Sequence, residues 1–156
     1  SEGVKVPILG IKTKIACDDI QKPKRVGSLL YVNTKKSVSN QVKKYLIEMC
    51  KIHLNYMCKE FSKRLGSKIR KVTLRDTRSR WGSCSSDANL MFSWRLIMAP
   101  EDVLAYVAAH EVAHLKHMNH SKDFWGTVEY LFGPYKKERA WLKQNGPSLH
   151  RYKFES

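Results

Sequence analysis

The chain has 156 residues, a length that suits one domain, and 42% of them are hydrophobic and 10% aromatic, which is enough for a packed core and argues against intrinsic disorder. No apolar run approaches the roughly 18 residues that a membrane span needs, and the first residues lack the pattern of a secretory signal, so we expect a cytoplasmic protein without a membrane partner. The excess of 29 Lys and Arg over 14 Asp and Glu gives a net charge of +15, which favours an anionic partner.

The first third of the chain predicts short strands. Apolar and polar residues alternate over residues 11–15, and residues 28–32 form a β-prone run after Gly27, both of which favour strands. A basic loop at residues 22–25 lies between them. We therefore expect the N-terminal strands to lie within residues 4–33.

A long amphipathic helix is predicted over about residues 40–65. Ser39 suits its N-cap, and Gly66 suits its C-terminal stop. Its apolar face should recur at steps of three and four residues, and the residues that fit are Val42, Leu46, Met49, His53, Tyr56, Met57, Phe61 and Leu65.

The next segment, residues 68–94, predicts strands again. Three β-prone runs are separated by turn-prone residues around Asp76 and Asp87, as an antiparallel meander requires. The last of the three runs is expected to continue through Trp94.

Helices are predicted for the remainder. Pro100 opens a helix expected over about residues 100–118, and further helices are expected within residues 121–145, interrupted at Gly133. The elements together predict an α+β fold, in which one small, mostly antiparallel sheet packs on three or four helices in a single domain of residues 1–156.

The strongest chemical signal lies in the helix that Pro100 opens. His110-Glu111-Val112-Ala113-His114 has the H-E-x-x-H spacing, which places both imidazoles on one helical face, where they can bind a single zinc ion. Glu111 stands beside them and can act as the general base that activates a water molecule. The alternative is that these three titratable residues are buried in the core without a metal. This would cost several kcal/mol, because their buried polar groups would lack partners.

A catalytic zinc site needs a third protein ligand and one open position. His120 is the best candidate, because Met118-Asn119 can break the helix and fold the chain back toward the metal. The alternatives are His117, which would point along a continuing helix, and Glu129 or Glu138 on a later helix.

Cysteine is not expected to supply ligands. The four cysteines form neither a Cys-x-x-Cys pair nor a zinc-finger spacing, so we expect reduced thiols without a catalytic role. They are Cys17, Cys50, Cys58 and Cys84.

At this point the chain resembles a known family. Three blocks carry the resemblance: RSRWGSCS at residues 78–85, FSWRLIMAP at residues 92–100, and HEVAH at residues 110–114 with Asn119-His120-Ser121 and Phe124-Trp125 behind it. They occur in the order found in the YgjP-like metallopeptidases, which are related to the SprT-like and Wss-type zincin proteases. The resemblance implies a minimal zincin fold with zinc on His110, His114 and His120, and Glu111 as the catalytic base.

The segment before the active helix offers candidate substrate contacts. A strand beside that helix could present its backbone to an extended peptide, and Gly82 would permit a close approach beside Trp81 and Ser83. Arg78 and Arg80 could bind an oxyanion, a carboxylate or a phosphate. Core packing is the alternative for Trp81, and a solvated strand surface is the alternative for the two arginines.

The positive charge is unevenly distributed. One basic cluster lies within residues 59–80 and a second near residues 136–153. Such clusters attract nucleic acid or another polyanion, although no nucleic-acid-binding motif accompanies them and a solvated surface is the alternative.

Three functions are compatible with these observations. The first is a zinc-dependent metallopeptidase that cleaves a peptide or protein substrate. The second is a metal-dependent hydrolase of a nucleotide or another small phosphate compound, since the same activated water could attack phosphorus. The third is a nucleic-acid-associated binding module with a structural zinc, which a closed set of four protein ligands would favour.

Overall fold

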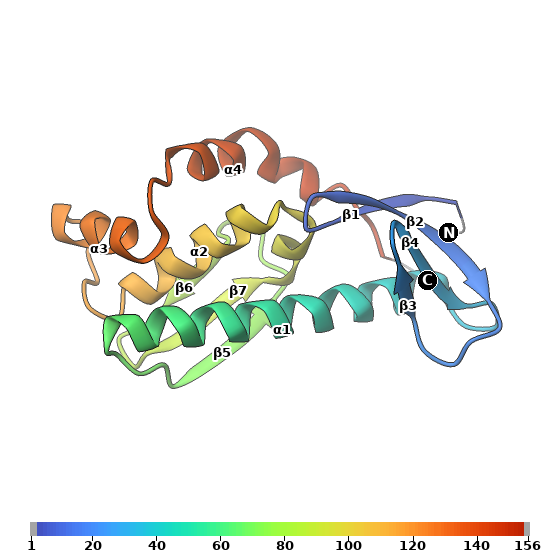
Figure 1. Ribbon diagram of the computed structural model, residues 1–156, viewed down its shortest axis with the longest axis horizontal. Coiled ribbons are helices and arrows are strands. Elements are labelled where there is room, and N and C mark those ends of the chain that lie inside the picture. The colour runs from blue at the N-terminus through green and yellow to red at the C-terminus, as the bar shows by residue number, and fades with distance from the viewer. Residues whose placement is uncertain (1–2, 155–156) are drawn as a thin grey trace.

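The computed structural model describes residues 3–154, and a long helix, α1, runs through most of its length (Figure 1). A first sheet lies at one end of α1, and a second sheet lies alongside the rest of it together with α2, α3 and α4. The predicted α+β class is confirmed. No helix in the described part of the chain is both long and apolar enough to cross a bilayer. The elements are β1 Lys5–Ile8, β2 Ile11–Asp18, β3 Lys24–Val26, β4 Leu29–Asn33, α1 Val38–Leu65, β5 Lys71–Arg75, β6 Gly82–Cys84, β7 Asn89–Ser93, the 3-10 helix η1 Trp94–Met98, α2 Glu101–Ala113, α3 Lys122–Phe132 and α4 Lys136–Leu149.

The strands form two mixed sheets, where the sequence predicted one mostly antiparallel sheet. The first has the order β1-β2-β4-β3, with β2 and β4 parallel, and the segment predicted as a basic loop contains strand β3. The second has the order β5-β7-β6, with β5 parallel and β6 antiparallel to β7. The predicted antiparallel meander is therefore wrong. Residues 76–81 cross from one edge of the sheet to the other, which leaves β7 in the centre and shortens the predicted strand at residues 78–84 to β6.

Helix α1 ends as predicted but begins earlier. Gly66 adopts a left-handed conformation with φ of 73° after the last turn, which glycine tolerates without strain. The N-cap is Ser37, whose hydroxyl oxygen accepts the Asn40 N–H at 3.3 Å, and not Ser39. The buried face also differs from the predicted one, since Tyr56 is 68% exposed. The buried row follows four-residue steps instead: Val42, Leu46, Cys50, Leu54, Cys58 and Ser62.

Helix α2 lies at the centre of the larger part of the molecule. It contacts α1, α3, α4, η1 and β6, and most of its residues are buried. A helix that is apolar on all sides is stable only in such an environment. Trp94, expected at the end of a strand, instead begins η1 and is buried in the core. This packing fixes the end of α2 that carries the H-E-x-x-H residues.

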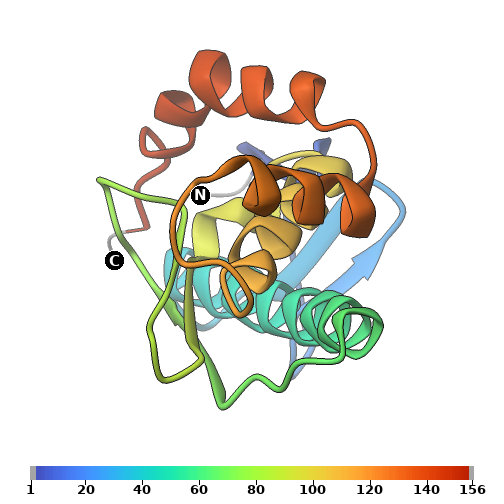
Figure 2. The ribbon, with the colours of Figure 1, turned by 90° about the vertical axis from the view of Figure 1, so that its left-hand side faces the viewer.

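Two further helices follow α2. Gly133 separates them, as predicted, and α4 continues to Leu149, past the predicted end at residue 145. Figure 2 shows α3 and α4 on the same side of α2, with α4 across the top of the view. Both helices contact α2, and Phe124 and Trp125 of α3 lie against the His110 ring.

Candidate metal centre

The histidines of the site come from the end of α2 and from the loop that follows it. His110 lies in the last turn of α2, and His114 caps the helix, with its N–H donating to the Glu111 carbonyl at 3.2 Å. The next N–H, that of Leu115, donates to the Val112 carbonyl at 2.9 Å. Such short-range bonds tighten and end a helix. The predicted helix to residue 118 is therefore too long.

Three imidazoles converge at this helix end. The ligand nitrogen atoms of His110, His114 and His120 all lie within 4.8 Å of one another. His120 is brought back by the start of α3, where the Ser121 hydroxyl oxygen accepts the Phe124 N–H at 3.2 Å. This group is suited to binding a metal ion.

The alternative third ligands do not join the group. His117, Glu129 and Glu138 lie outside the one cluster of potential metal ligands found among residues 3–154. His117 contributes its backbone instead, because its carbonyl oxygen lies 3.0 Å from Nδ1 of His114. A proton on Nδ1 makes this contact a hydrogen bond and leaves Nε2 of His114 free for a metal.

Burial keeps the inner imidazoles neutral, as metal binding requires. It lowers the pKa of His110 to about 3, and His114 and His120 add to the effect by disfavouring a second positive charge nearby. Burial also lowers the pKa of His114. Both rings therefore carry an available lone pair at neutral pH.

Aromatic side chains from α3 hold the three imidazoles in place. The fully buried Phe124 stacks on His114 with 4.3 Å between ring centroids, and its edge contacts with His110 and His120 are both at 5.0 Å. Trp125 stacks on His120 at 5.9 Å. The sequence marks these two residues only as part of the blocks that carry the family resemblance, which does not indicate that they support the imidazoles.

The carboxylate of Glu111 lies beside the imidazoles in a tightly packed position. Its Oε2 is 4.0 Å from Nε2 of His110, and the residue is only 5% exposed. Burial raises the pKa of Glu111 to about 8, and the positive charge of Arg80 opposes this shift. A Cβ at Gly82 would lie 2.9 Å from Cγ and 3.0 Å from Oε2 of Glu111. Gly82 thus packs directly against Glu111, while the close approach of a substrate peptide at Gly82 stays a prediction.

An open cleft of about 450 Å³ leads to these groups. Of the candidate substrate contacts, Arg80, Gly82 and Ser83 line the cleft. Strand β6 forms one edge of its sheet, so its outer backbone groups face away from β7. The cleft is also lined by Ser79, Cys84 and Met118.

The other two candidates lie elsewhere. Trp81 stacks on His150 at 5.2 Å, and its indole would be 3.0 Å from a Cβ at Gly146 in α4. It also lines a smaller cavity of about 200 Å³ behind Glu111. Arg78 lines neither of the two cavities, and its role in substrate binding stays a prediction.

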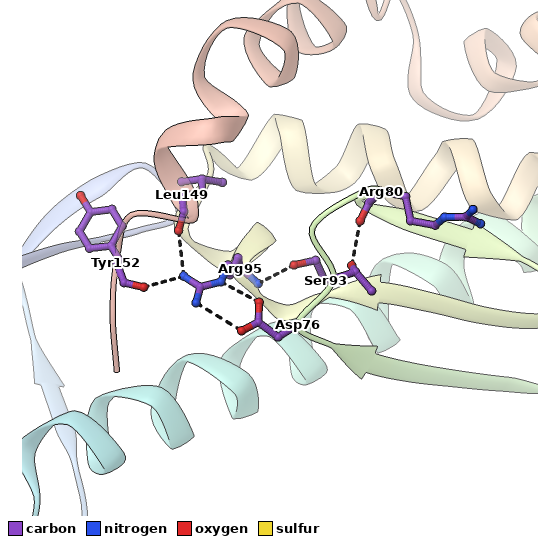
Figure 3. A network of polar contacts seen from close by, with 7 residues as sticks. Asp76, Arg80, Ser93, Arg95, Leu149 and Tyr152 are labelled. Atoms are coloured by element: carbon purple, nitrogen blue, oxygen red, sulfur yellow. Dashed lines mark hydrogen bonds and ion pairs between the residues drawn. The ribbon is translucent and has the colours of Figure 1, made fainter. Parts of the chain in front are cut away.

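The buried side chain of Arg95 anchors the loop of residues 76–81, which leads to strand β6 (Figure 3). Arg95 is 4% exposed and donates to Asp76 at 2.8 and 3.3 Å, and to the backbone carbonyls of Leu149 and Tyr152 at 2.9 and 2.8 Å. At the other end of the loop, the Thr77 hydroxyl donates to the Arg80 carbonyl at 2.8 Å. Arg95 thus connects the loop of residues 76–81 to the chain at the end of α4.

The α+β fold with three converging histidines and a buried glutamate on one helix end is that of a metallopeptidase domain. Residues 1–145 match the sequence profile of the YgjP-like metallopeptidase domain. Because that match covers most of the chain, the protein belongs to the YgjP-like family, as the motif blocks predicted.

A solved structure supports the fold. The metallopeptidase zymogen abylysin of Pyrococcus abyssi superposes with a TM-score of 0.51 at 20% sequence identity, over 60% of this chain and 93% of that one. No curated protein matches the chain significantly. The family match and the three-histidine group together indicate a metal-dependent hydrolase of the metallopeptidase type.

Proposed function

We propose that the protein is a zinc-dependent peptidase with His110, His114 and His120 as the metal ligands. An all-imidazole set of three neutral donors suits zinc, and the described residues add no fourth ligand to the group. A zinc ion bound there would supply Lewis-acid chemistry, polarising the scissile carbonyl group and lowering the pKa of water. An open coordination position favours an enzyme over a module with a structural zinc.

Glu111 carries the proton transfers in this proposal. Its buried carboxylate beside the imidazoles, at the base of an open cleft, is the observation that supports catalysis most directly. A pKa raised by burial makes this carboxylate a stronger base than a solvated one. Glu111 takes a proton from the attacking water and delivers it to the leaving amine.

The substrate is proposed to be an extended peptide segment. The outer edge of β6 can pair with such a segment through its backbone, and Ser83 and Cys84 place that edge along the cleft. Arg80 is exposed at the cleft, where its guanidinium can donate hydrogen bonds to a substrate carbonyl. These contacts hold the scissile bond near Glu111.

The test combines metal analysis with turnover on unstructured polypeptides and, separately, on nucleoside triphosphates. We expect Glu111→Gln to keep zinc and lose activity by about 10²- to 10⁴-fold, and His114→Ala to lose zinc. His117→Ala is the matched control, because it retains the backbone carbonyl that contacts His114 and should keep both zinc and turnover. Turnover of triphosphates alone would replace the peptidase with the phosphate-hydrolase alternative, and full activity of Glu111→Gln would refute its role as the base.

A further inference from the structure

Another hollow, of about 500 Å³, lies between the C-terminal half of α1 and strand β5. We call it the basic groove, because five cationic side chains line it and no acidic residue does. All five residues are exposed. They are Lys59 and Lys63 from α1, Lys68 and Arg70 from the connection, and Lys71 from β5.

The charges of the basic groove are not neutralised by the protein. The one ion pair between charged side chains among residues 3–154 joins Arg95 to Asp76, and the other close contact of this kind joins the neutral His110 to Glu111, so none of the five cations takes part in either. The nearby Glu60 on α1 is exposed but does not line the groove. Like charges gathered in this way repel one another, and an anion bound between them relieves the repulsion.

The remaining lining residues indicate what kind of anion fits. Asn55 and Ser67 offer polar hydrogen-bonding groups, and Ile69 and Val72 add small apolar surfaces. No aromatic ring lines the groove, so it offers no surface on which bases could stack. Contacts of this type bind a phosphate backbone and carry no sequence information.

We propose that the basic groove binds the phosphodiester backbone of a nucleic-acid strand without sequence preference. The site is separate from the metal centre, because β5 and β6 occupy opposite edges of the same sheet. The proposal therefore goes beyond the peptidase function and does not depend on it. Figure 1 shows α1 and β5 side by side on the opposite side of the molecule from α4.

The salt dependence of binding provides the test. The probe is a short, fluorescein-labelled single strand of DNA, and its affinity for the full chain is measured by anisotropy over a range of salt concentrations. Five phosphate contacts predict a slope of about −3.5 for log K against log salt concentration. Strands of different sequence should give the same affinity and slope.

Paired variants locate the site. Lys59→Ala combined with Lys71→Ala removes one cation from each wall of the basic groove and should make the slope shallower by about 1.4. Lys12→Ala combined with Lys14→Ala is the matched control, because it removes the same charge from exposed positions on β2 and should leave the slope unchanged. Thermal melts of both variants confirm that they are folded.

Two results would overturn the proposal. An equal loss in both double variants would mean that net charge, and not the basic groove, attracts the strand. Tighter binding of polyglutamate than of DNA with the same number of charges would identify an acidic polypeptide as the occupant.

Discussion

Substitution of Gly82 by alanine is expected to disturb the catalytic base without touching the metal ligands. The added Cβ would meet Glu111 at 2.9 Å from Cγ, 3.0 Å from Oε2 and 3.2 Å from Cδ, whereas ordinary contacts are 3.4–4 Å. Glu111 is 5% exposed on a helix packed on all sides, so its backbone cannot withdraw. The carboxylate or strand β6 must therefore move by about half an ångström.

The size of the effect follows from that displacement. A misplacement of about 1 Å at a reacting group can lower the rate by about 10²-fold. A displacement of about half that distance therefore corresponds to a roughly tenfold lower rate, or about 1.4 kcal/mol of activation free energy. Overpacking also costs about 1–3 kcal/mol of stability. We expect Gly82→Ala to lower kcat/KM by about tenfold or more, with zinc content unchanged and Tm reduced.

The assay measures kcat/KM on an unstructured polypeptide, zinc content and Tm for Gly82→Ala and for a glycine control. Gly126→Ala in α3 is that control, since a Cβ there meets nothing within 4 Å. Alanine should stabilise this helix by about 0.5–1 kcal/mol without changing the rate. Wild-type kcat/KM in zinc-loaded Gly82→Ala, with loss of activity in Glu111→Gln, would show that β6 does not position the base.

Other parts of the structure give further predictions. Arg95 lowers the pKa of Asp76 by hydrogen bonding to its carboxylate. The ionised carboxylate therefore stabilises the fold at pH values above the ordinary pKa of Asp, and this stabilisation is lost as the pH falls through the lowered pKa of Asp76. Because the Asp76 side chain is 40% exposed, Asp76→Asn should cost only about 1 kcal/mol at neutral pH, and thermal melts should show the difference from wild type shrinking in acid. Ser37→Ala should lower the free energy of unfolding by about 1 kcal/mol in urea titrations, whereas Ser39→Ala should not, and the opposite result would restore Ser39 as the cap. Phe124→Leu should weaken zinc binding by about tenfold in chelator competition, because its ring supports all three imidazoles, and unchanged affinity would contradict that support.

The three-histidine group could be predicted because its signal is local. The spacing of His110 and His114 within one helix determines that both lie on one face, and a helix break was enough to favour His120. The contact between Gly82 and Glu111 joins two elements that are distant in the chain. The sequence predicted only that a substrate peptide could approach the backbone at Gly82, and the contact with Glu111 is known only from the fold.

The same distinction explains the errors in the fold. Strand positions follow from local alternation, while strand order depends on which edges meet after the chain folds. The crossover at residues 76–81 therefore turned a predicted meander into a mixed sheet. On α1, the prediction centred the buried face on large side chains such as Tyr56, whereas Cys50 and Cys58 occupy it, since a reduced cysteine packs as a small hydrophobic residue.

The strong positive charge of the chain and its metal chemistry are physically separate properties. Strands β5 and β6 flank β7, and two strand spacings of about 4.8 Å put nearly 10 Å between the edges, with the cations of the basic groove lying beyond β5. No cation of the basic groove is among the charges that shift the pKa of Glu111. The pKa of Glu111 is instead determined by burial, which raises it, and by the charge of Arg80, which offsets only part of that rise. We therefore expect a DNA strand bound in the basic groove to leave both the β6 edge and the protonation of Glu111 unchanged.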